Sequence, residues 1–171
     1  YGILTRIDVA VLVVALQRAA HKCKYIHVKR LNTLVRWVQQ HPLTLTYRRL
    51  STPDGMAAGT HLRCLSDAAF RNEGDTGHAL KGAAFMRIAA DPSQYGSAEG
   101  HVVDWMCGRQ RHVTRGVFSS ELFGVCDAAD RALLLAQLLH EVQTGACSKC
   151  EARRLRLEGG LTTKIVLVVD S

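Results

Sequence analysis

Three acidic residues stand where a fold could gather them around a metal ion. Asp67 lies at the end of a mainly apolar run that starts at Leu62, and Asp170 closes the apolar run 165–169. Glu121 opens a long amphipathic segment. Strand ends and first helical turns bring together side chains from distant parts of a chain, and grouped carboxylates favour hard divalent cations such as Mg²⁺. Asp67, Glu121 and Asp170 are therefore the candidate catalytic and metal-binding residues. The alternative is that all three are solvated acids, with Glu121 complementing a helix dipole.

The elements that must position these acids can be predicted from apolar runs bounded by turn residues. Such runs indicate strands at 62–67, 83–88, 101–106 and 164–169. The first three follow one another directly, as in an antiparallel meander. The unbroken Val, Ile and Leu residues of the fourth predict a central place in the sheet.

A long helix is expected between the third and fourth strands. Ser119 or Ser120 can cap its start, and Gly145 is a stop signal. Its predicted buried side is Leu122, Val125, Ala129, Ala132, Leu133, Ala136, Leu139 and Val142. The order β-β-β-α-β predicts an α/β fold with a mixed sheet.

Two helices precede this domain in the prediction. Residues 7–20 are almost continuously apolar and predict a buried helix, and residues 25–40 have helical spacing with a basic remainder. Proline at position 42 ends the second helix. Alternation over 43–47 indicates a half-buried strand, and the turn 51–55 marks a domain boundary. The predicted domains are 1–55 and 56–171.

Composition indicates a globular protein with an anionic partner. The chain has 171 residues, of which 47% are hydrophobic, and 22 Lys+Arg stand against 15 Asp+Glu, so the net charge is +7. This balance excludes wholesale disorder and favours a polyanionic partner. No apolar run is long enough to cross a bilayer, and none resembles a signal peptide. The six cysteines lie mostly in apolar segments, which predicts reduced, buried thiols in an intracellular protein.

A basic loop precedes Glu121 and is the candidate nucleic-acid contact. Arg109, Gln110, Arg111 and Arg115 could bind phosphates, although a charged loop can equally be a solvated surface. Cys147 and Cys150 have the spacing of a zinc-binding pair, but a second pair is missing, so the function of these two residues stays open. Trp37 and Trp105 are interpreted as core residues.

Several short motifs, in this order, resemble the end of a copia-type LTR retrotransposon reverse transcriptase. They are Leu4-Thr5-Arg6-Ile7-Asp8-Val9, His27-Val28-Lys29-Arg30-Leu31, Val35-Arg36-Trp37-Val38, Leu65-Ser66-Asp67-Ala68, Ser119-Ser120-Glu121-Leu122 and Val168-Val169-Asp170-Ser171. The resemblance covers the connection region and the ribonuclease H domain. It implies a ribonuclease H-like mixed sheet after a two-helix lead-in, in a piece of a longer polyprotein whose fourth acid would follow Ser171.

The resemblance also implies a chemistry. Asp67 would bridge two Mg²⁺ ions, with Mn²⁺ as a substitute, and Glu121 and Asp170 would each bind one. Two such ions about 4 Å apart activate the attacking water and stabilise the leaving oxygen. The expected function is hydrolysis of the RNA strand of RNA·DNA hybrids during reverse transcription, beside the polymerase domain of the same polyprotein, in the cytoplasm or nucleus. The alternative is a catalytically inactive remnant that binds nucleic acid or packs on the polymerase.

Overall fold

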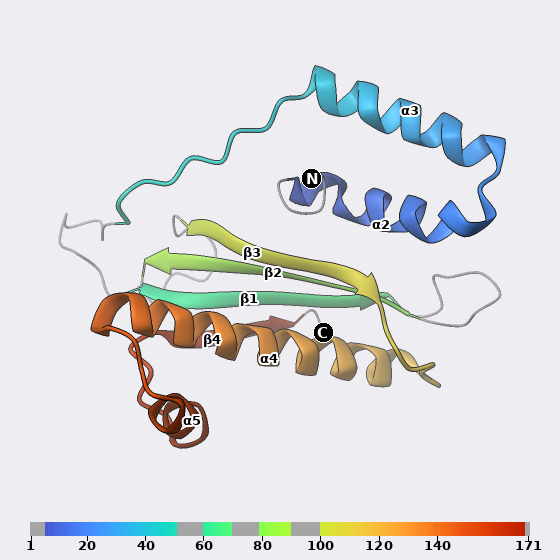
Figure 1. Ribbon diagram of the computed structural model, residues 1–171. Helices are drawn as coiled ribbons and strands as arrows, with labels where there is room; N and C mark the ends of the chain where they lie inside the picture. The colour runs from blue at the N-terminus through green and yellow to red at the C-terminus, as the bar shows by residue number, and fades with distance from the viewer. Residues whose placement is uncertain (1–5, 51–59, 70–78, 90–99, 170–171) are drawn as a thin grey trace. The chain divides into compact units, whose positions relative to one another are not determined.

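The computed structural model describes residues 6–50, 60–69, 79–89 and 100–169. The chain divides into two compact units, residues 1–46 and residues 47–171 (Figure 1). Asp170 and the predicted turn 51–55 lie outside the described residues. Each unit is described by itself below.

The first unit is helical. It consists of the 3-10 turn η1 (Ile7–Val9), α2 (Ala10–Ala19), the 3-10 turn η2 (Ala20–Lys22) and α3 (Tyr25–Gln40). The predicted helix 25–40 is confirmed with the same ends. The prediction of a buried first helix is wrong, because Ala10 is the only buried residue of α2 and the described remainder of the helix is exposed or half-buried.

Arg6 fixes the start of this helical unit. Its guanidinium donates to both carboxylate oxygens of Asp8, at 2.9 and 2.7 Å, and lies 5.7 Å from the centre of the Trp37 ring. The hydrogen bond with Arg6 lowers the pKa of Asp8. Trp37 is 41% exposed, so its predicted place in a core is wrong; it instead forms a stacking surface for Arg6 and His41.

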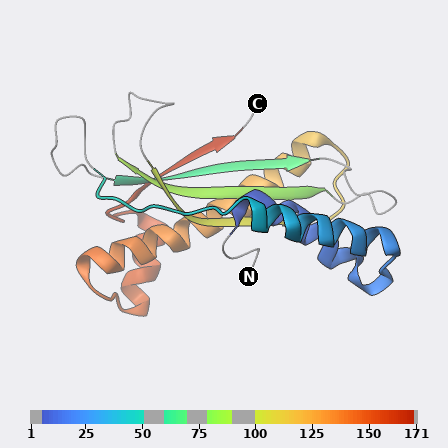
Figure 2. The same ribbon diagram turned by 90° about the horizontal axis from the view of Figure 1, so that it is seen from above.

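The second unit is built on a four-stranded mixed sheet, which confirms the predicted α/β class. The strands are β1 (Thr60–Ala69), β2 (Leu80–Ala89), β3 (Gly100–Arg109) and β4 (Lys164–Val169). Their order is β3-β2-β1-β4, with β1, β2 and β3 antiparallel and β4 parallel to β1 (Figure 2). The predicted meander is therefore confirmed.

The expected central position of the fourth strand is wrong. Among the described strands β4 lies at the edge of the sheet, beside β1. Its residue Ile165 packs against the core, whereas Leu167 and Val169 are 42% and 41% exposed. An unbroken apolar run identified a strand here, but strand order depends on pairing that the run does not encode.

One long helix, α4 (Val117–Thr144), covers one face of the sheet (Figure 1). It begins after Gly116, so Ser119 and Ser120 lie inside its first turn and do not cap it. Gly145 ends it with φ of 102°, as predicted. The predicted buried side is confirmed in part: Ala132 and Ala136 are buried and Leu139 packs against the core, whereas Leu122 and Val142 are exposed. The other buried residues are Ser120, Gly124, Ala128 and His140. Small residues at every fourth position let the helix lie close to the strands.

The remaining segments are shorter. Helix α5 (Lys149–Glu158) occupies the region predicted to be irregular or briefly helical, and Ser148 caps it by accepting a hydrogen bond from the amide of Glu151. The strand predicted at 43–47 is wrong, because this segment forms no strand pairing in the described residues. Tyr47 instead donates its hydroxyl to the carbonyl of Val102. No helix among the described residues is long and apolar enough to cross a membrane.

Candidate active site

Asp67 lies near the end of β1 with its side chain exposed. Its neighbours Ser66 and Ala68 are buried against α4. Because successive side chains of a strand point to opposite faces, Asp67 leaves the sheet on the face away from α4. Its partner on β2 is Gly82, and a Cβ atom added there would meet only the carbonyl of Met106, at 3.8 Å. The carboxylate of Asp67 therefore has open space beside it.

Glu121 is brought to the same end of β1 by the packing of α4. Gly124, one turn further along the helix, lies so close to the strand that an added Cβ atom would be 3.2 Å from the Cβ of Ala68 and 3.9 Å from the carbonyl oxygen of Asp67. Glu121 is half-buried in this first part of the helix. The packing of α4 thus brings the helix turn that carries Glu121 to the end of β1 that carries Asp67, while the Asp67 side chain itself points to the opposite face of the sheet.

The third predicted acid follows β4 in the sequence. The last paired residue of β4, Val169, lies opposite Ser66 of β1 in the parallel register. Asp67 and Asp170 are the residues that directly follow this pair. Asp170 itself lies outside the described residues, so the convergence of the three carboxylates stays a prediction. In the described part of the chain, no three His, Cys, Asp or Glu side chains are grouped closely enough to hold a metal ion.

Several acids of the chain are ion-paired, and the described candidate acids are not among them. Asp8, Asp104, Asp127 and Glu151 each pair with a Lys or Arg side chain. Within the ranges that the structure describes, neither Asp67 nor Glu121 has such a partner.

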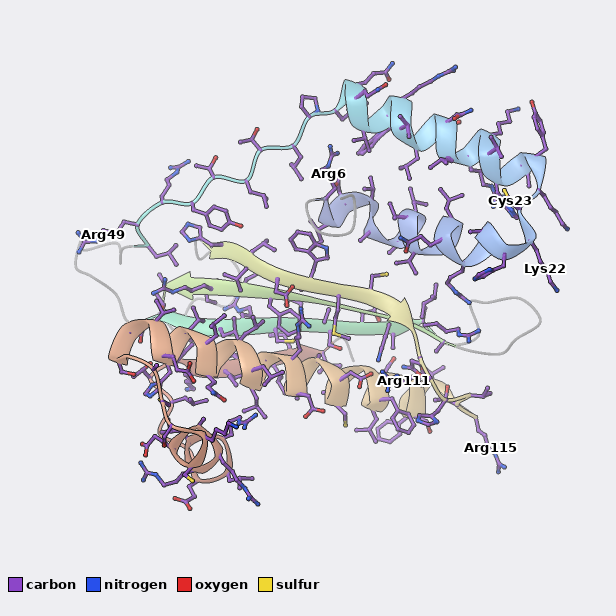
Figure 3. The ribbon with its side chains drawn as sticks, viewed as in Figure 1. Arg6, Lys22, Cys23, Arg49, Arg111 and Arg115 are labelled. Carbon is purple, nitrogen blue, oxygen red and sulfur yellow. The ribbon has the colours of Figure 1, made fainter. Side chains whose placement is uncertain are left out.

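The basic loop leads from β3 into α4. Arg109, Arg111 and Arg115 are exposed, and Figure 3 shows Arg111 and Arg115 on this loop. Gln110 differs from them because its side chain is 2% exposed. Its amide nitrogen Nε2 donates to the carbonyl of Ser120 at 2.5 Å, and its backbone N–H donates to Ala79 at 2.9 Å. In this structure Gln110 ties the loop to α4, while the three arginines are the groups that a phosphate can reach.

A cleft beside this loop was not predicted from the sequence. It has a volume of about 380 Å³ and is lined by Lys81, Gln110, Arg111, His112, Phe123 and Asp127. Lys81 forms an ion pair with Asp127, and the rings of His112 and Phe123 are 5.8 Å apart. The helical wheel places Asp127 on the far side of α4 from Glu121, but it gives no indication that Lys81 of β2 would meet it.

The positive charge is concentrated in the helical unit. Residues 1–46 contain seven Lys and Arg and one Asp, whereas residues 47–171 contain fifteen basic and fourteen acidic residues. The helical unit therefore carries +6 of the net charge of +7. Lys22, Lys24, Lys29, Arg30 and Arg36 are all exposed; Figure 3 shows Lys22 at the turn between α2 and α3.

The cysteines differ from the prediction of buried thiols. All six are free, but Cys23, Cys126 and Cys150 are exposed and only Cys64 is fully buried. Burial raises the pKa of Cys64 to about 11. Desolvation, Glu141 and Glu151 raise the pKa of Cys147, which disfavours the thiolate that zinc requires.

Comparison of the chain with protein-family models, with curated proteins and with solved structures found no match.

Proposed function

We propose that the chain is a ribonuclease H-type endonuclease, which hydrolyses the RNA strand of RNA·DNA hybrids with the help of Mg²⁺. The observation that carries the proposal is the close contact of Gly124 with residues 66–68, which sets the helix turn of Glu121 beside the end of β1 that holds Asp67. The strand order β3-β2-β1-β4, with β4 parallel to β1 and α4 across the sheet, is the arrangement expected of a ribonuclease H-like fold.

The residues at this site suit a divalent cation. The carboxylate of Asp67 is exposed beside Gly82, and Glu121 lies on the adjoining helix turn. Oxygen ligands of this kind are those that Mg²⁺ prefers. When bound, the ions would supply an activated water and charge stabilisation for the leaving oxygen. Asp67, Glu121 and Asp170 would hold them, and Asp170 joins the set by its place after Val169 in the sequence.

The chain's own basic residues supply the binding of the substrate. A hybrid duplex is recognised largely through its shape, its phosphates and its 2′-hydroxyl groups. Exposed arginines at 109, 111 and 115 can contact phosphates near the start of α4. The charge of +6 on the helical unit adds a second, sequence-independent attraction for the polyanion. Together these features favour a long nucleic acid as the substrate.

The test is cleavage of the RNA strand of a labelled RNA·DNA hybrid with Mg²⁺ or Mn²⁺. It should be run on residues 1–171 and on a form that continues beyond Ser171. We expect Asp67→Asn and Glu121→Gln to abolish cleavage while leaving hybrid binding in place. Asp130→Asn is the matched control, because Asp130 is an exposed acid on the same helix.

Two results would contradict the proposal. One is cleavage by the wild-type protein that survives both substitutions at full rate. The other is tight binding of the hybrid with no cleavage by either form in either metal, together with Mn²⁺ binding that Asp67→Asn does not weaken. The second result would favour a non-catalytic module that binds nucleic acid or packs on a polymerase.

A further inference from the structure

The cleft beside the loop 110–112 has the features of a binding site that the nuclease reaction does not use. Its volume of about 380 Å³ exceeds what a single nucleobase fills. Its floor is Gln110, which is 98% buried and held by the carbonyls of Ala79 and Ser120. The Oε1 atom of Gln110 is buried and has no hydrogen-bond partner among the described residues.

The walls of the cleft combine an aromatic surface with a charged pair. The ring of Phe123 lies 5.8 Å from that of His112, with 37° between their planes. Nucleobases stack on such surfaces with little dependence on sequence. On the adjoining wall, the ammonium group of Lys81 and the carboxylate of Asp127 form an ion pair. Their side chains are 15% and 48% exposed, so the pair still presents a donor and an acceptor to the cleft.

The surroundings of Lys81 disfavour its charged form. Burial lowers the pKa of Lys81, and the positive charge of Arg111 lowers it further. Lys81 also forms the ion pair with Asp127. A ligand that offers an acceptor to Lys81 and donors to Asp127 would therefore satisfy both groups at once.

We propose that this cleft binds one unpaired nucleobase of a nucleic-acid strand, and that it prefers guanine. The Watson–Crick edge of guanine places the O6 acceptor beside the N1–H and N2–H donors. O6 then accepts from Lys81, the two N–H groups donate to Asp127, and the base stacks on Phe123. Adenine, cytosine and uracil each lack two adjacent donors beside an acceptor. Arg111, at the mouth, contacts the phosphate of the same nucleotide.

The location links this pocket to the nuclease site, and to that extent the inference rests on the proposed function. Lys81 is paired with Ala68, the residue after Asp67. Asp127 lies six residues after Glu121, about 240° around α4. The cleft and Glu121 therefore lie on different sides of the same part of α4, a helix about 10 Å wide. A strand that passes the start of α4 can offer a phosphate to the acids and an unpaired nucleotide to the cleft.

The experiment measures binding without cleavage. Residues 1–171 are titrated, in EDTA, against a fluorescent RNA·DNA hybrid that ends in a short single-stranded overhang. The overhang contains guanine, inosine or adenine at one position, so the sequence-independent attraction of the basic helices is the same in each. We expect guanine to bind roughly fivefold or more tightly than adenine. Inosine, which lacks the N2 amino group, should fall between them.

Variants separate stacking from hydrogen bonding. Asp127→Asn should bring the guanine and adenine overhangs to similar affinity, because an amide no longer offers two acceptors. Phe123→Ala should weaken the binding of all three overhangs by at least about fivefold. Phe123→Leu should weaken their binding less than Phe123→Ala does if packing alone is what Phe123 contributes. Phe118→Ala is the matched control, since Phe118 is a 76% exposed aromatic on α4 that does not line the cleft.

Equal affinity for the three overhangs, or a loss in Phe123→Ala no larger than in Phe118→Ala, would overturn the proposal. Since no divalent ion is present, these results do not depend on whether the protein cleaves. A protein that selects guanine but never cleaves would refute only the endonuclease, and one that cleaves without selecting a base would refute only the pocket.

Discussion

Substitution of Gly124 by alanine probes the contact on which the candidate site depends. The added Cβ atom would stand 3.2 Å from the Cβ of Ala68 and 3.7 Å from the Oγ of Ser66. The first distance is shorter than ordinary van der Waals contact, and neither Ala68 nor the strand behind it can rotate away. The helix or the strand must therefore move by a few tenths of an ångström.

The expected change in stability is the difference between two effects. Alanine in place of glycine in a helix interior stabilises by about 1 kcal/mol. Overpacking of a close contact costs about 1–3 kcal/mol. Gly124→Ala should therefore be neutral or lower the free energy of unfolding by up to about 2 kcal/mol, as measured by urea denaturation. Gly108→Ala is the control, because a Cβ atom there meets nothing within 4 Å.

Cleavage should respond more strongly than stability. Glu121 precedes Gly124 by one turn, so a shift of the helix changes the spacing between its carboxylate and that of Asp67. Small errors in the placement of catalytic groups reduce rates sharply, by about a hundredfold for a displacement near 1 Å. We expect Gly124→Ala to lose several-fold or more of the cleavage rate. A variant stabilised by the full helix-propensity gain, with unchanged cleavage, would show that α4 does not press on β1 at this point.

Three further predictions concern pH and salt. Burial raises the pKa of Cys64 from 9.0 to about 11, so on raising the pH the unfolded state loses this proton before the folded state does. The free energy of unfolding should therefore fall by up to about 2 kcal/mol between pH 9 and 11. Urea denaturation should show that Cys64→Ala flattens this fall. Burial lowers the pKa of His61, and the charges of Arg63 and Lys164 lower it further. The contribution of His61 to the free energy of unfolding is therefore present above about pH 6.5 and lost as the pH falls. Urea denaturation in acid should show that His61→Gln loses stability less steeply than the wild-type protein. Arg30→Gln should reduce the salt dependence of log K for hybrid binding by roughly 0.9, whereas Arg153→Gln, an exposed arginine on α5, should leave the slope unchanged.

Local patterns predicted the elements well because they are set by neighbouring residues. Helix 25–40 has apolar residues at helical spacing and a proline two residues after its end, and the structure reproduces both ends. The run 164–169 likewise matches β4. The apolar run from Leu62 placed Asp67 near the end of a strand, where the structure has it. These features need no knowledge of the rest of the chain.

Contacts between elements could not be predicted in the same way. The predicted buried side of α4 included Leu122 and left out Gly124, yet Leu122 is 52% exposed and Gly124 is buried. The reason is the closeness of α4 to β1, which leaves room only for small side chains. The pairing of Lys81 with Asp127 has the same origin, because it joins residues 46 positions apart. A stripe of Gly and Ala at every fourth position was the signal that could have revealed this close packing.

The uneven distribution of positive charge allows one protein to hold an acidic site and also to attract an anionic substrate. In the sheet unit, Asp104 and Asp127 are already held by Arg131 and Lys81. A cation placed equally close to Asp67 would occupy its carboxylate and compete with a divalent ion. With +6 in the helical unit and nearly balanced charge in the sheet unit, most of the net positive charge that attracts a polyanion is remote in sequence from the acids, and only Arg109, Arg111 and Arg115 lie near Glu121 in the sequence. Transfer of positive charge to the tip of β1, for instance by Gly82→Lys, should therefore weaken Mn²⁺ binding even where it strengthens binding of the hybrid.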